Sequence, residues 1–364
     1  MVKEKEMYTK LKKLLILLFI LPLGGCKHTN KTHDKMIQEN FSYGVGVTSP
    51  KEYPTEVHIG YLLDQNKKLI CGMPRSGTNG GGWTYKGKQG GMGGSSIPYY
   101  LNLTYVAYAE KKFYKVEAAL PADKILAEFK KGFLIESNQK EIIDGEERYK
   151  MEPSTYDVLT VGAAPGGCIV VWLSGNHHRT EICRLQAKET FVDKNDFLGF
   201  VDKTESQQKF LDDLYKITVP DSIKAEITQK GIPYGLWDQY REKYKYRFVL
   251  KSYDEKDFLT GYYVINYNGE SNFVPYNPQE VAQYRKTSIP YNANLYFKKY
   301  FTEIIFNDRE MLQVFDKLKK KYPETPIDII IKPTFMYDDM KISVKCTTEE
   351  IPLTKYKVVG VWGG

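Results

Sequence analysis

The residues with the clearest potential for chemistry lie in a glycine-rich segment. Gly82 to Lys88 matches most of a phosphate-binding loop, in which glycine backbone and a lysine hold the phosphates. Such a loop also needs Ser or Thr after the lysine and a helix behind it. Here Gln89 follows, and the chain continues as a glycine run to Gly94 that disfavours a helix. We therefore expect an irregular surface loop and no nucleotide site.

A second glycine cluster runs from Gly162 through Pro165 and Gly166 to Gly167. A dinucleotide-binding fingerprint would begin a helix here, whereas the next residues have the pattern of another strand. Proline fixes φ and glycine allows positive φ, so the cluster predicts a tight turn between two strands. We expect Trp172, in the second of these strands, to lie in the core.

Metal-binding and nucleophile motifs are missing from the sequence. His177 and His178 are adjacent, and adjacent side chains on a strand point to opposite faces. No Cys-x-x-Cys, His-Glu-x-x-His or Gly-x-Ser-x-Gly pattern occurs. We predict no catalytic residues, no metal and no cofactor. Lack of a motif removes only recognisable enzymes, and a hydrolase using the loop from Gly72 to Gly94 stays an alternative.

The start of the chain has the layout of a secretory signal. Basic residues up to Lys13 precede an apolar run from Leu14 to Leu23, and Gly24-Gly25-Cys26 follows. The run is about half the length of roughly 20 residues that a membrane span requires. Leu-x-Gly-Cys resembles the bacterial lipobox, so we predict cleavage of a signal peptide, residues 1–25, and lipidation of Cys26.

The lipid would fix the protein to the envelope. A diacylglycerol on the thiol and an acyl chain such as palmitate on the new amino terminus together give firm anchoring. Lys27 stands where inner-membrane lipoproteins carry aspartate, so resemblance to known sorting patterns favours the outer membrane. Residues 26–40 are polar and without periodicity, and we interpret them as a flexible tether.

Four cysteines remain after Cys26: Cys71, Cys168, Cys183 and Cys346. Buried free thiols are the favoured interpretation. A disulfide between Cys168 and Cys183 stays open, because both flank an expected hairpin and the envelope permits disulfides.

Composition argues against nucleic-acid binding. The formal charge is +7, and the predicted signal peptide alone carries five lysines and two glutamates. The remaining excess is weak and spread along the chain, whereas a nucleic-acid binder clusters its basic residues on one face.

The 29 Tyr and 17 Phe suit strands, and helical periodicity is scarce. Helices are expected at Pro121–Lys131, Glu205–Tyr215, Asp221–Lys230 and Leu236–Glu242, and from Asn307 with Glu310 completing a capping box. We predict an α+β fold that is β-rich, with mostly antiparallel strands and a few short helices.

The second part of the chain repeats the first. The pattern Ser-Ile-Pro-Tyr-x-x-Asn-Leu occurs at 96–103 and again at 288–295. A strand and then a helix follow both copies. We infer a duplication, with one β-rich half at 41–203, which holds the glycine-rich loop, and a second at 204–364.

Four segments resemble a family of bacterial putative lipoproteins catalogued as domain of unknown function 2931. They cover roughly residues 41–250, and the resemblance implies an envelope lipoprotein without naming a reaction. Within them we single out Gly82, Trp83, Pro98, Tyr114, Pro121, Gly162, Pro165, Gly166, Gly167, Trp172 and Trp237 as motif residues of unknown role.

The function expected is that of a non-enzymatic lipoprotein that binds a protein partner in the envelope, one version being an immunity protein against a toxin. The alternative is glycan or peptidoglycan binding by aromatic residues. Candidates for that surface are Trp83, Tyr85, Tyr99, Tyr100, Trp237, Tyr240, Tyr244 and Tyr246.

Overall fold

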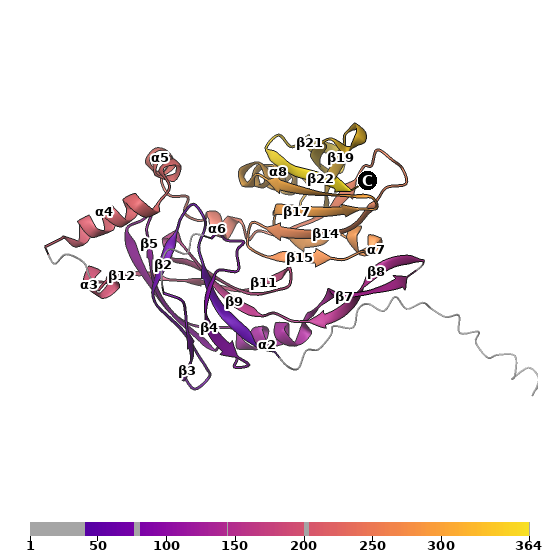
Figure 1. The fold of residues 1–364 in the computed structure, drawn as a ribbon. Helices are drawn as coiled ribbons and strands as arrows, with labels where there is room; N and C mark the ends of the chain where they lie inside the picture. Colours follow the sequence, from indigo (N-terminus) through magenta and orange to yellow (C-terminus); the bar gives the residue numbers. More distant parts are fainter. Residues whose placement is uncertain (1–40, 76–80, 144, 200–203, 364) are drawn as a thin grey trace, which may run out of the picture. The chain divides into compact units, whose positions relative to one another are not determined.

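The computed structural model describes residues 41–75, 81–143, 145–199 and 204–363. The predicted signal peptide, the tether and Cys26 therefore lie outside the described residues. The described chain is β-rich, with several antiparallel sheets and few short helices (Figure 1), which confirms the predicted class. Among these residues, no helix is long and apolar enough to cross a membrane.

Two sets of five strands form the first half. One is a sheet ordered β12-β6-β5-β2-β3, and the other, ordered β11-β10-β9-β1-β4, belongs to a larger sheet. The strands are β1 (Tyr43–Thr48), β2 (Thr55–Leu63), β3 (Leu69–Gly72), β4 (Lys88–Gly94), β5 (Tyr100–Ala107), β6 (Lys112–Ala119), β9 (Val158–Ala164), β10 (Cys168–Gly175), β11 (His178–Gln186) and β12 (Lys188–Thr190).

Two sets of five strands also form the second half, ordered β22-β18-β17-β14-β15 and β16-β13-β19-β20-β21. The strands are β13 (Tyr244–Leu250), β14 (Leu259–Asn266), β15 (Ser271–Val274), β16 (Arg285–Thr287), β17 (Pro290–Phe297), β18 (Tyr300–Phe306), β19 (Ile327–Pro333), β20 (Met340–Cys346), β21 (Glu349–Pro352) and β22 (Tyr356–Gly363).

The two halves pair their strands in the same pattern. β1 is antiparallel to β4 and parallel to β9, while β13 is antiparallel to β16 and parallel to β19. β5 lies between β2 and β6, and β17 lies between β14 and β18. A helix follows β6 and another follows β18 at the same point in the order.

The expected helices are present. They are α2 (Ala122–Lys131), α4 (Gln207–Thr218), α5 (Asp221–Lys230), α6 (Leu236–Gln239) and α8 (Asp308–Lys321), with short α3 (Lys194–Phe197) and α7 (Pro278–Val281) in addition. The capping box of α8 is only half formed. The Asn307 side chain accepts from the Glu310 N–H, but the Glu310 carboxylate accepts from Thr354 and Lys355 instead of turning back.

The glycine run was expected to be an irregular loop, and for Lys88–Gly94 this is wrong, because these residues form β4. Glycine is needed here because β4 runs very close to its neighbours. A Cβ on Gly91 would lie 2.2 Å from the Gly72 carbonyl oxygen, and one on Gly93 would lie 2.1 Å from the Tyr43 ring. The strand is therefore glycine-rich for reasons of packing.

The turn between β9 and β10 agrees with the prediction. Pro165–Gly167 forms a short 3-10 turn, η1, in which Gly166 and Gly167 both have φ of 74°. Trp172, on β10, is fully buried, as expected. Cys71, Cys168, Cys183 and Cys346 are all free thiols. On the β10–β11 hairpin, Cys183 lies opposite Val171, so it does not face Cys168.

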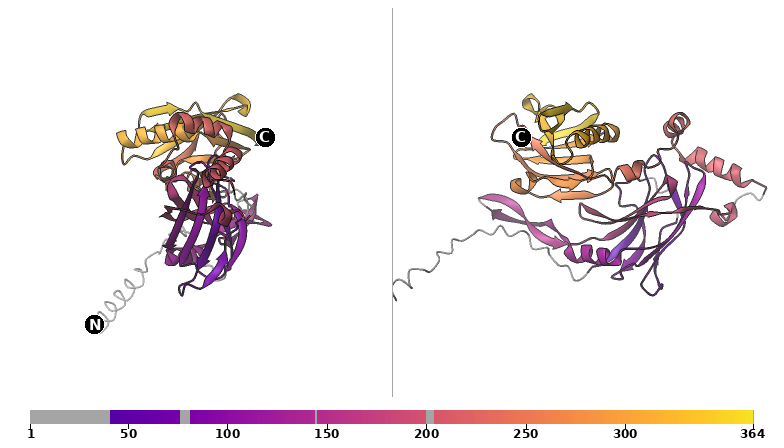
Figure 2. Two further views of the ribbon diagram at one scale, coloured as in Figure 1. Left: turned by 90° about the vertical axis from the view of Figure 1, so that its left-hand side faces the viewer. Right: turned by 180° about the vertical axis from the view of Figure 1, so that it is seen from behind.

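A two-stranded ribbon of β7 (Phe133–Ile143) and β8 (Glu146–Ser154) has no counterpart among the described residues of the second half. It lies beside the second half in Figure 1 and in the right-hand view of Figure 2. The Arg148 guanidinium sits 3.9 Å from the centre of the Tyr276 ring. The two halves also join at a sheet edge, where Arg179 of β11 pairs with Ser271 of β15.

One hydrophobic core extends through both halves. It includes Trp83, Trp172 and Trp237 together with Phe315 and Ile329 of the second half. A separate core lies within the first half, around Tyr105 and Phe129. The described residues from Phe41 onward consequently form one compact unit.

Candidate functional site

Several motif residues meet at the centre of the shared core. The Trp83 and Trp172 rings meet edge to face with 5.0 Å between their centres. Gly162 makes room for them, since a Cβ there would lie 2.5 Å from the Trp172 ring. The Arg179 guanidinium lies 4.2 Å from the centre of the Trp172 ring and donates to the Trp83 carbonyl at 2.8 Å. These contacts explain Gly162, Trp83 and Trp172 as packing residues.

Glu110 connects three further motif segments. Its Oε2 accepts the Gly166 backbone N–H at 2.8 Å, and its Oε1 accepts the hydroxyls of Tyr114 at 2.7 Å and Tyr234 at 2.8 Å. Burial and this carboxylate raise the pKa of Tyr234 to about 12. We call this arrangement the Glu110 clasp. It holds the Pro-Gly-Gly turn and the segment before Trp237 against the end of β5.

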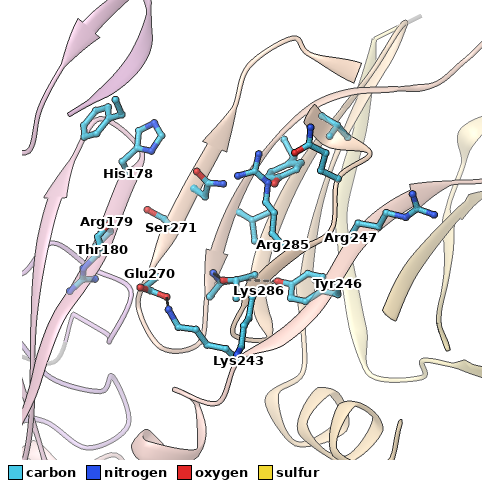
Figure 3. A pocket seen from close by; sticks show the side chains of 18 of the residues that line it. His178, Arg179, Thr180, Lys243, Tyr246, Arg247, Glu270, Ser271, Arg285 and Lys286 are labelled. Atoms are coloured by element: carbon cyan, nitrogen blue, oxygen red, sulfur yellow. Dashed lines mark hydrogen bonds and ion pairs between the residues drawn. The ribbon is translucent and has the colours of Figure 1, made fainter. Parts of the chain in front are cut away.

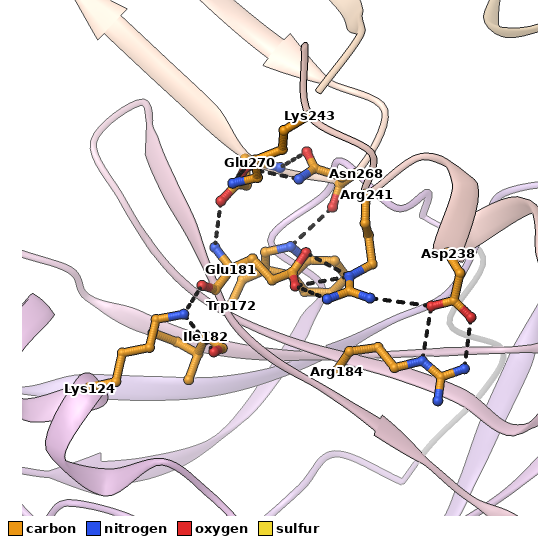
Figure 4. Close-up of polar contacts among 10 residues, drawn as sticks. All are labelled: Lys124, Trp172, Glu181, Ile182, Arg184, Asp238, Arg241, Lys243, Asn268 and Glu270. Atoms are coloured by element: carbon orange, nitrogen blue, oxygen red, sulfur yellow. Dashed lines mark hydrogen bonds and ion pairs between the residues drawn. The ribbon is translucent and has the colours of Figure 1, made fainter. Parts of the chain in front are cut away.

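The segment that carries Trp237 is tied to β11 by ion pairs (Figure 4). Asp238 receives two hydrogen bonds from the Arg184 guanidinium, at 3.0 and 2.8 Å. Arg241 binds Glu181 through Nε and Nη2, the shorter contact being 2.7 Å. The Trp237 ring meets the Tyr53 ring edge to face at 5.5 Å. These contacts hold α6 and the residues that follow it against β11 and Tyr53 of the first half.

The other motif residues lie elsewhere. Pro98 is buried before β5, and Pro121 stands at the start of α2, where its carbonyl accepts the Ile125 N–H at 3.0 Å. The structure therefore brings Gly82, Trp83, Gly162, Trp172 and Trp237 together but leaves Pro98 and Pro121 apart. Cys26 lies outside the described residues.

Part of the proposed aromatic surface forms a small pocket of about 170 Å³. Its aromatic walls are Tyr53, Trp83, Trp237, Tyr240, Tyr267 and Tyr291. Trp83 Nε1 is buried and has no hydrogen-bond partner among the described residues. Of the eight residues proposed for an aromatic surface, Trp83, Trp237 and Tyr240 line this pocket, which is half of its six aromatic residues. The other five lie elsewhere: Tyr244 and Tyr246 in the core, Tyr85 at an exposed position, Tyr99 just before β5 and Tyr100 at its start.

A larger cleft of about 410 Å³ lies between the two halves. Elements far apart in sequence line it: the α2–β7 junction and β11 on one side, and β13, β14, β15 and β16 on the other. Figure 3 shows side chains of both halves facing this space. Phe248, Val264 and Val281 supply an apolar part of its wall.

The cleft is rich in positive charge. The basic side chains among its lining residues, apart from Arg179 whose guanidinium lies over Trp172, are Lys131, His178, Lys243, Arg247, Arg285 and Lys286. Glu270 is the one carboxylate among the lining residues of the described chain. It receives Lys243 at 2.9 Å and the Glu181 N–H at 3.2 Å. Outside the lining, Asp328 pairs with Arg247 at 2.8 Å, Glu280 with Arg285 at 2.6 Å and Glu128 with Lys131 at 3.2 Å. Lys286 is therefore the one cation of this set without an ion pair in the described chain.

Several of these donors are not fully used. Lys286 is exposed and forms no ion pair within the described chain. Arg285 binds Glu280 through Nη2, but its buried Nε has no partner in the described residues. His178 stacks on Phe133 at 4.1 Å, and its Nε2 is also buried without a partner there. Burial lowers the pKa of His178 to about 4, so the ring is neutral at neutral pH.

Sequence reasoning did not find this cleft. Its cations come from three separate segments, at Lys131, at Lys243 and Arg247, and at Arg285 and Lys286, which the fold brings together. A usable signal was present in the alternating Lys243, Lys245 and Arg247 and in the adjacent Arg285 and Lys286. Of the two adjacent histidines, His177 packs on Tyr263 and His178 stacks on Phe133, so their rings contact different side chains. No group of three or more His, Cys, Asp or Glu side chains in the described chain could hold a metal ion.

The loop proposed for a hydrolase, from Gly72 to Gly94, contains no Asp or Glu of its own. Asp157 is near it, and this carboxylate pairs with Lys86 at 3.4 Å. General acid and base catalysis by paired carboxylates has no support from this geometry.

Comparison with known proteins identifies a family. Residues 27–235 match the family described as Protein of unknown function (DUF2931). Trp237, Tyr240 and Arg241 lie just beyond the matched region, as do all the described strands of the second half. No curated protein matches the chain, and neither does any solved structure. The match covers more than half of the chain and agrees with the motif segments from Gly82 to Tyr234, so the chain belongs to the DUF2931 family.

Proposed function

We propose that this protein is a lipid-anchored envelope protein that binds a protein partner without catalysing a reaction. The observation that carries the proposal is the cleft of about 410 Å³ between the halves, with its unused donors and apolar wall. Concave sites of this volume with a few convergent polar groups are typical of ligand binding. An immunity protein that blocks a toxin is one version of this function.

The anchor is part of the same proposal. The lipobox at Leu23-Gly24-Gly25-Cys26 supports lipidation of Cys26, and Lys27 supports sorting to the outer membrane. A tether at 26–40 would let the folded body reach a partner near the membrane. Tethering raises the local concentration of a binding site, which suits a protein that captures its partner.

We also infer that the halves at 41–203 and 204–364 arose by duplication. Their strand pairing has the same pattern, and the Ser-Ile-Pro-Tyr motif precedes β5 in one half and β17 in the other. The cleft lies where the two copies face one another. A binding site between duplicated halves is a common outcome, because pockets form readily at the interfaces of structural units.

Site-specific photocrosslinking in cells tests the proposal. Benzoylphenylalanine would replace the exposed Gln283 in the cleft, with Lys341, outside the cleft, as the matched control position. We expect one dominant adduct from position 283 and none of the same mass from 341. The Cys26→Ala variant should lose both acyl labelling with palmitate and the adduct. Identical adducts from both positions, or none from position 283, would contradict protein binding through the cleft.

Glycan binding is a second candidate, favoured by the six aromatic residues of the smaller pocket. Aromatic rings stack on sugar rings and supply large contact areas. Titration with muropeptides should quench tryptophan fluorescence in a saturable way if this is right. Tyr291→Ala should weaken the signal and Tyr253→Ala, at an exposed position elsewhere, should not. An unchanged signal at every concentration would remove this candidate.

A further inference from the structure

The cleft is lined by β15 and β16 of the second half, whereas the corresponding strands of the first half lie against each other. There, β3 and β4 occupy the positions that β15 and β16 occupy in the second half. β4 approaches closely because it consists largely of glycine, and a Cβ on Gly90 would lie 2.8 Å from Pro74. β16 consists of Arg285, Lys286 and Thr287 instead, and all three line the open cleft together with Ser271 and Asn272 of β15.

β16 is also an edge strand. Its sheet ends there, so none of the described strands pairs with its outer side. Edge strands with free N–H and C=O groups can accept an additional extended segment. In the first half the corresponding end strand, β4, lies against β3, whereas in the second half β16 has the cleft beside it.

Further lysines lie beside the cleft on β16 and on the neighbouring strand β13. Lys245 of β13 lies directly opposite Lys286 of β16. A second hollow of about 250 Å³ adjoins the cleft, and it shares Lys243 and Lys286 and adds Lys245 and Lys319. Lys319 contacts Glu242 at 3.3 Å, while Lys245 forms no ion pair in the described chain.

The arrangement differs from an ordinary lysine pair on a sheet. Lys332 and Lys341 also face each other, on β19 and β20 of the same sheet, but both lie outside the two hollows. Like charges directly opposite destabilise a sheet, and an anion between them removes that cost. Of these two pairs, only Lys245–Lys286 borders the hollows, with Lys286 lining both and Lys245 the smaller, and only this pair includes an edge strand.

We propose that the β16 edge binds an extended acidic peptide segment of a protein partner. Backbone groups of the segment would pair with the outer side of β16, its carboxylates would contact Lys245, Lys286 and Lys243, and its apolar side chains would enter the cleft. Because successive side chains of a strand point to opposite faces, the carboxylates would lie on one face of the segment and the apolar side chains on the other. This inference rests on the proposed function and names the chemistry of the partner.

Binding of a labelled peptide of alternating glutamate and valine to the detergent-solubilised full-length protein tests it, with fluorescence anisotropy as the readout. We expect saturable binding that weakens with added salt, and no saturation by the glutamine counterpart. Reversal of both charges in Lys245→Glu/Lys286→Glu should weaken binding about tenfold or more. The matched variant Lys332→Glu/Lys341→Glu should bind like the wild type, and circular dichroism would establish that both variants are folded.

Competition distinguishes the sources of negative charge. Inorganic phosphate or vesicles containing phosphatidylglycerol, at equal concentration of charge, should displace the peptide only weakly. Complete displacement, equal binding of both peptides, or equal loss in both lysine variants would overturn the peptide assignment. A partner captured from position 283 with no binding of the acidic peptide would overturn this inference and leave the proposed function standing.

Discussion

Trp172 donates its indole Nε1–H to the backbone carbonyl oxygen of Asn268 at 3.1 Å. Both residues are fully buried, and they belong to different halves of the chain. The contact lies beside Gly269, whose Cα approaches the Trp172 ring so closely that a Cβ would be 3.1 Å from it. This hydrogen bond therefore connects the centre of the first half to the β14–β15 turn of the second.

Removal of this bond should destabilise the protein in a measurable way. Trp172→Phe leaves the Asn268 carbonyl buried without its donor, which costs about 1–3 kcal/mol in addition to the lost packing. Trp83→Phe is the matched control, because Trp83 Nε1 has no partner among the described residues. Urea unfolding should therefore show the larger loss for Trp172→Phe. Equal losses in the two variants would mean that the bond contributes nothing.

The same contact illustrates what the sequence could reveal. Trp172 was predicted to be a core residue because it lies in an apolar strand, and that is confirmed. Its partner Asn268 could be placed in an Asn-Gly turn, but no local pattern links positions so far apart. Helices α4, α5 and α6 were predictable for the opposite reason, since their periodicity and end signals are local.

The ribbon and β4 were less accessible to sequence reasoning. The tip of the ribbon is largely exposed and charged, so it lacks the alternation of apolar residues that marks a half-buried strand. β4 was missed because glycine is rare inside strands, and its reason for being there is the close approach of β1 and β3. The cationic cleft depends on the pairing of β13 with β16, which is equally non-local.

Gly162 should tolerate no side chain. A Cβ would lie 2.5 Å from the Trp172 ring and 3.0 Å from the Trp83 ring, and both rings are held in a packed core. Gly162→Ala should therefore lower the free energy of unfolding by about 1–3 kcal/mol through overpacking. Gly199→Ala is the matched control, since a Cβ there meets nothing within 4 Å. A lower melting temperature for Gly199→Ala than for Gly162→Ala would contradict this account.

The Glu110 clasp predicts a graded response. In Glu110→Gln, the amide oxygen can still accept the Gly166 N–H, and the amide NH2 can donate to the hydroxyls of Tyr114 and Tyr234. This variant should therefore lower the free energy of unfolding by only about 1 kcal/mol. Glu110→Ala removes the acceptor of the Gly166 N–H and the Tyr114 hydroxyl, while the exposed Tyr234 hydroxyl can turn to water. This variant should therefore cost about 2–3 kcal/mol. Denaturant unfolding of both variants would measure the difference.

An ultraviolet titration gives an independent readout of the clasp. The pKa of Tyr234 is raised to about 12 by burial and then by Glu110. Neutralising the carboxylate in Glu110→Gln should move this pKa toward its ordinary value of 10. No movement in the tyrosine titration, with unchanged stability of Glu110→Ala, would show that the clasp does not form.

His178 should make the protein sensitive to mild acid. Burial lowers its pKa to about 4, whereas in the unfolded chain the value is 6.5. Between these values the unfolded state binds more protons, so the free energy of unfolding falls as the pH falls from 6.5 to about 4. The separation of the two pKa values corresponds to roughly 3 kcal/mol over that window. His178→Phe, which keeps a ring against Phe133, should flatten this part of the stability profile.

His58→Phe is the control for this experiment, because the pKa of His58 is also lowered by burial but its ring faces Phe197, far from the cleft. Urea unfolding at a series of pH values should show a smaller slope for His178→Phe than for His58→Phe. Binding of the acidic peptide should also change how the free energy of unfolding depends on pH. An anion beside Nε2 favours the protonated ring, so binding at the cleft should raise the pKa of His178 and recover stability near pH 5 in the wild type alone. Equal slopes in the two variants would exclude His178 as the source of the acid sensitivity.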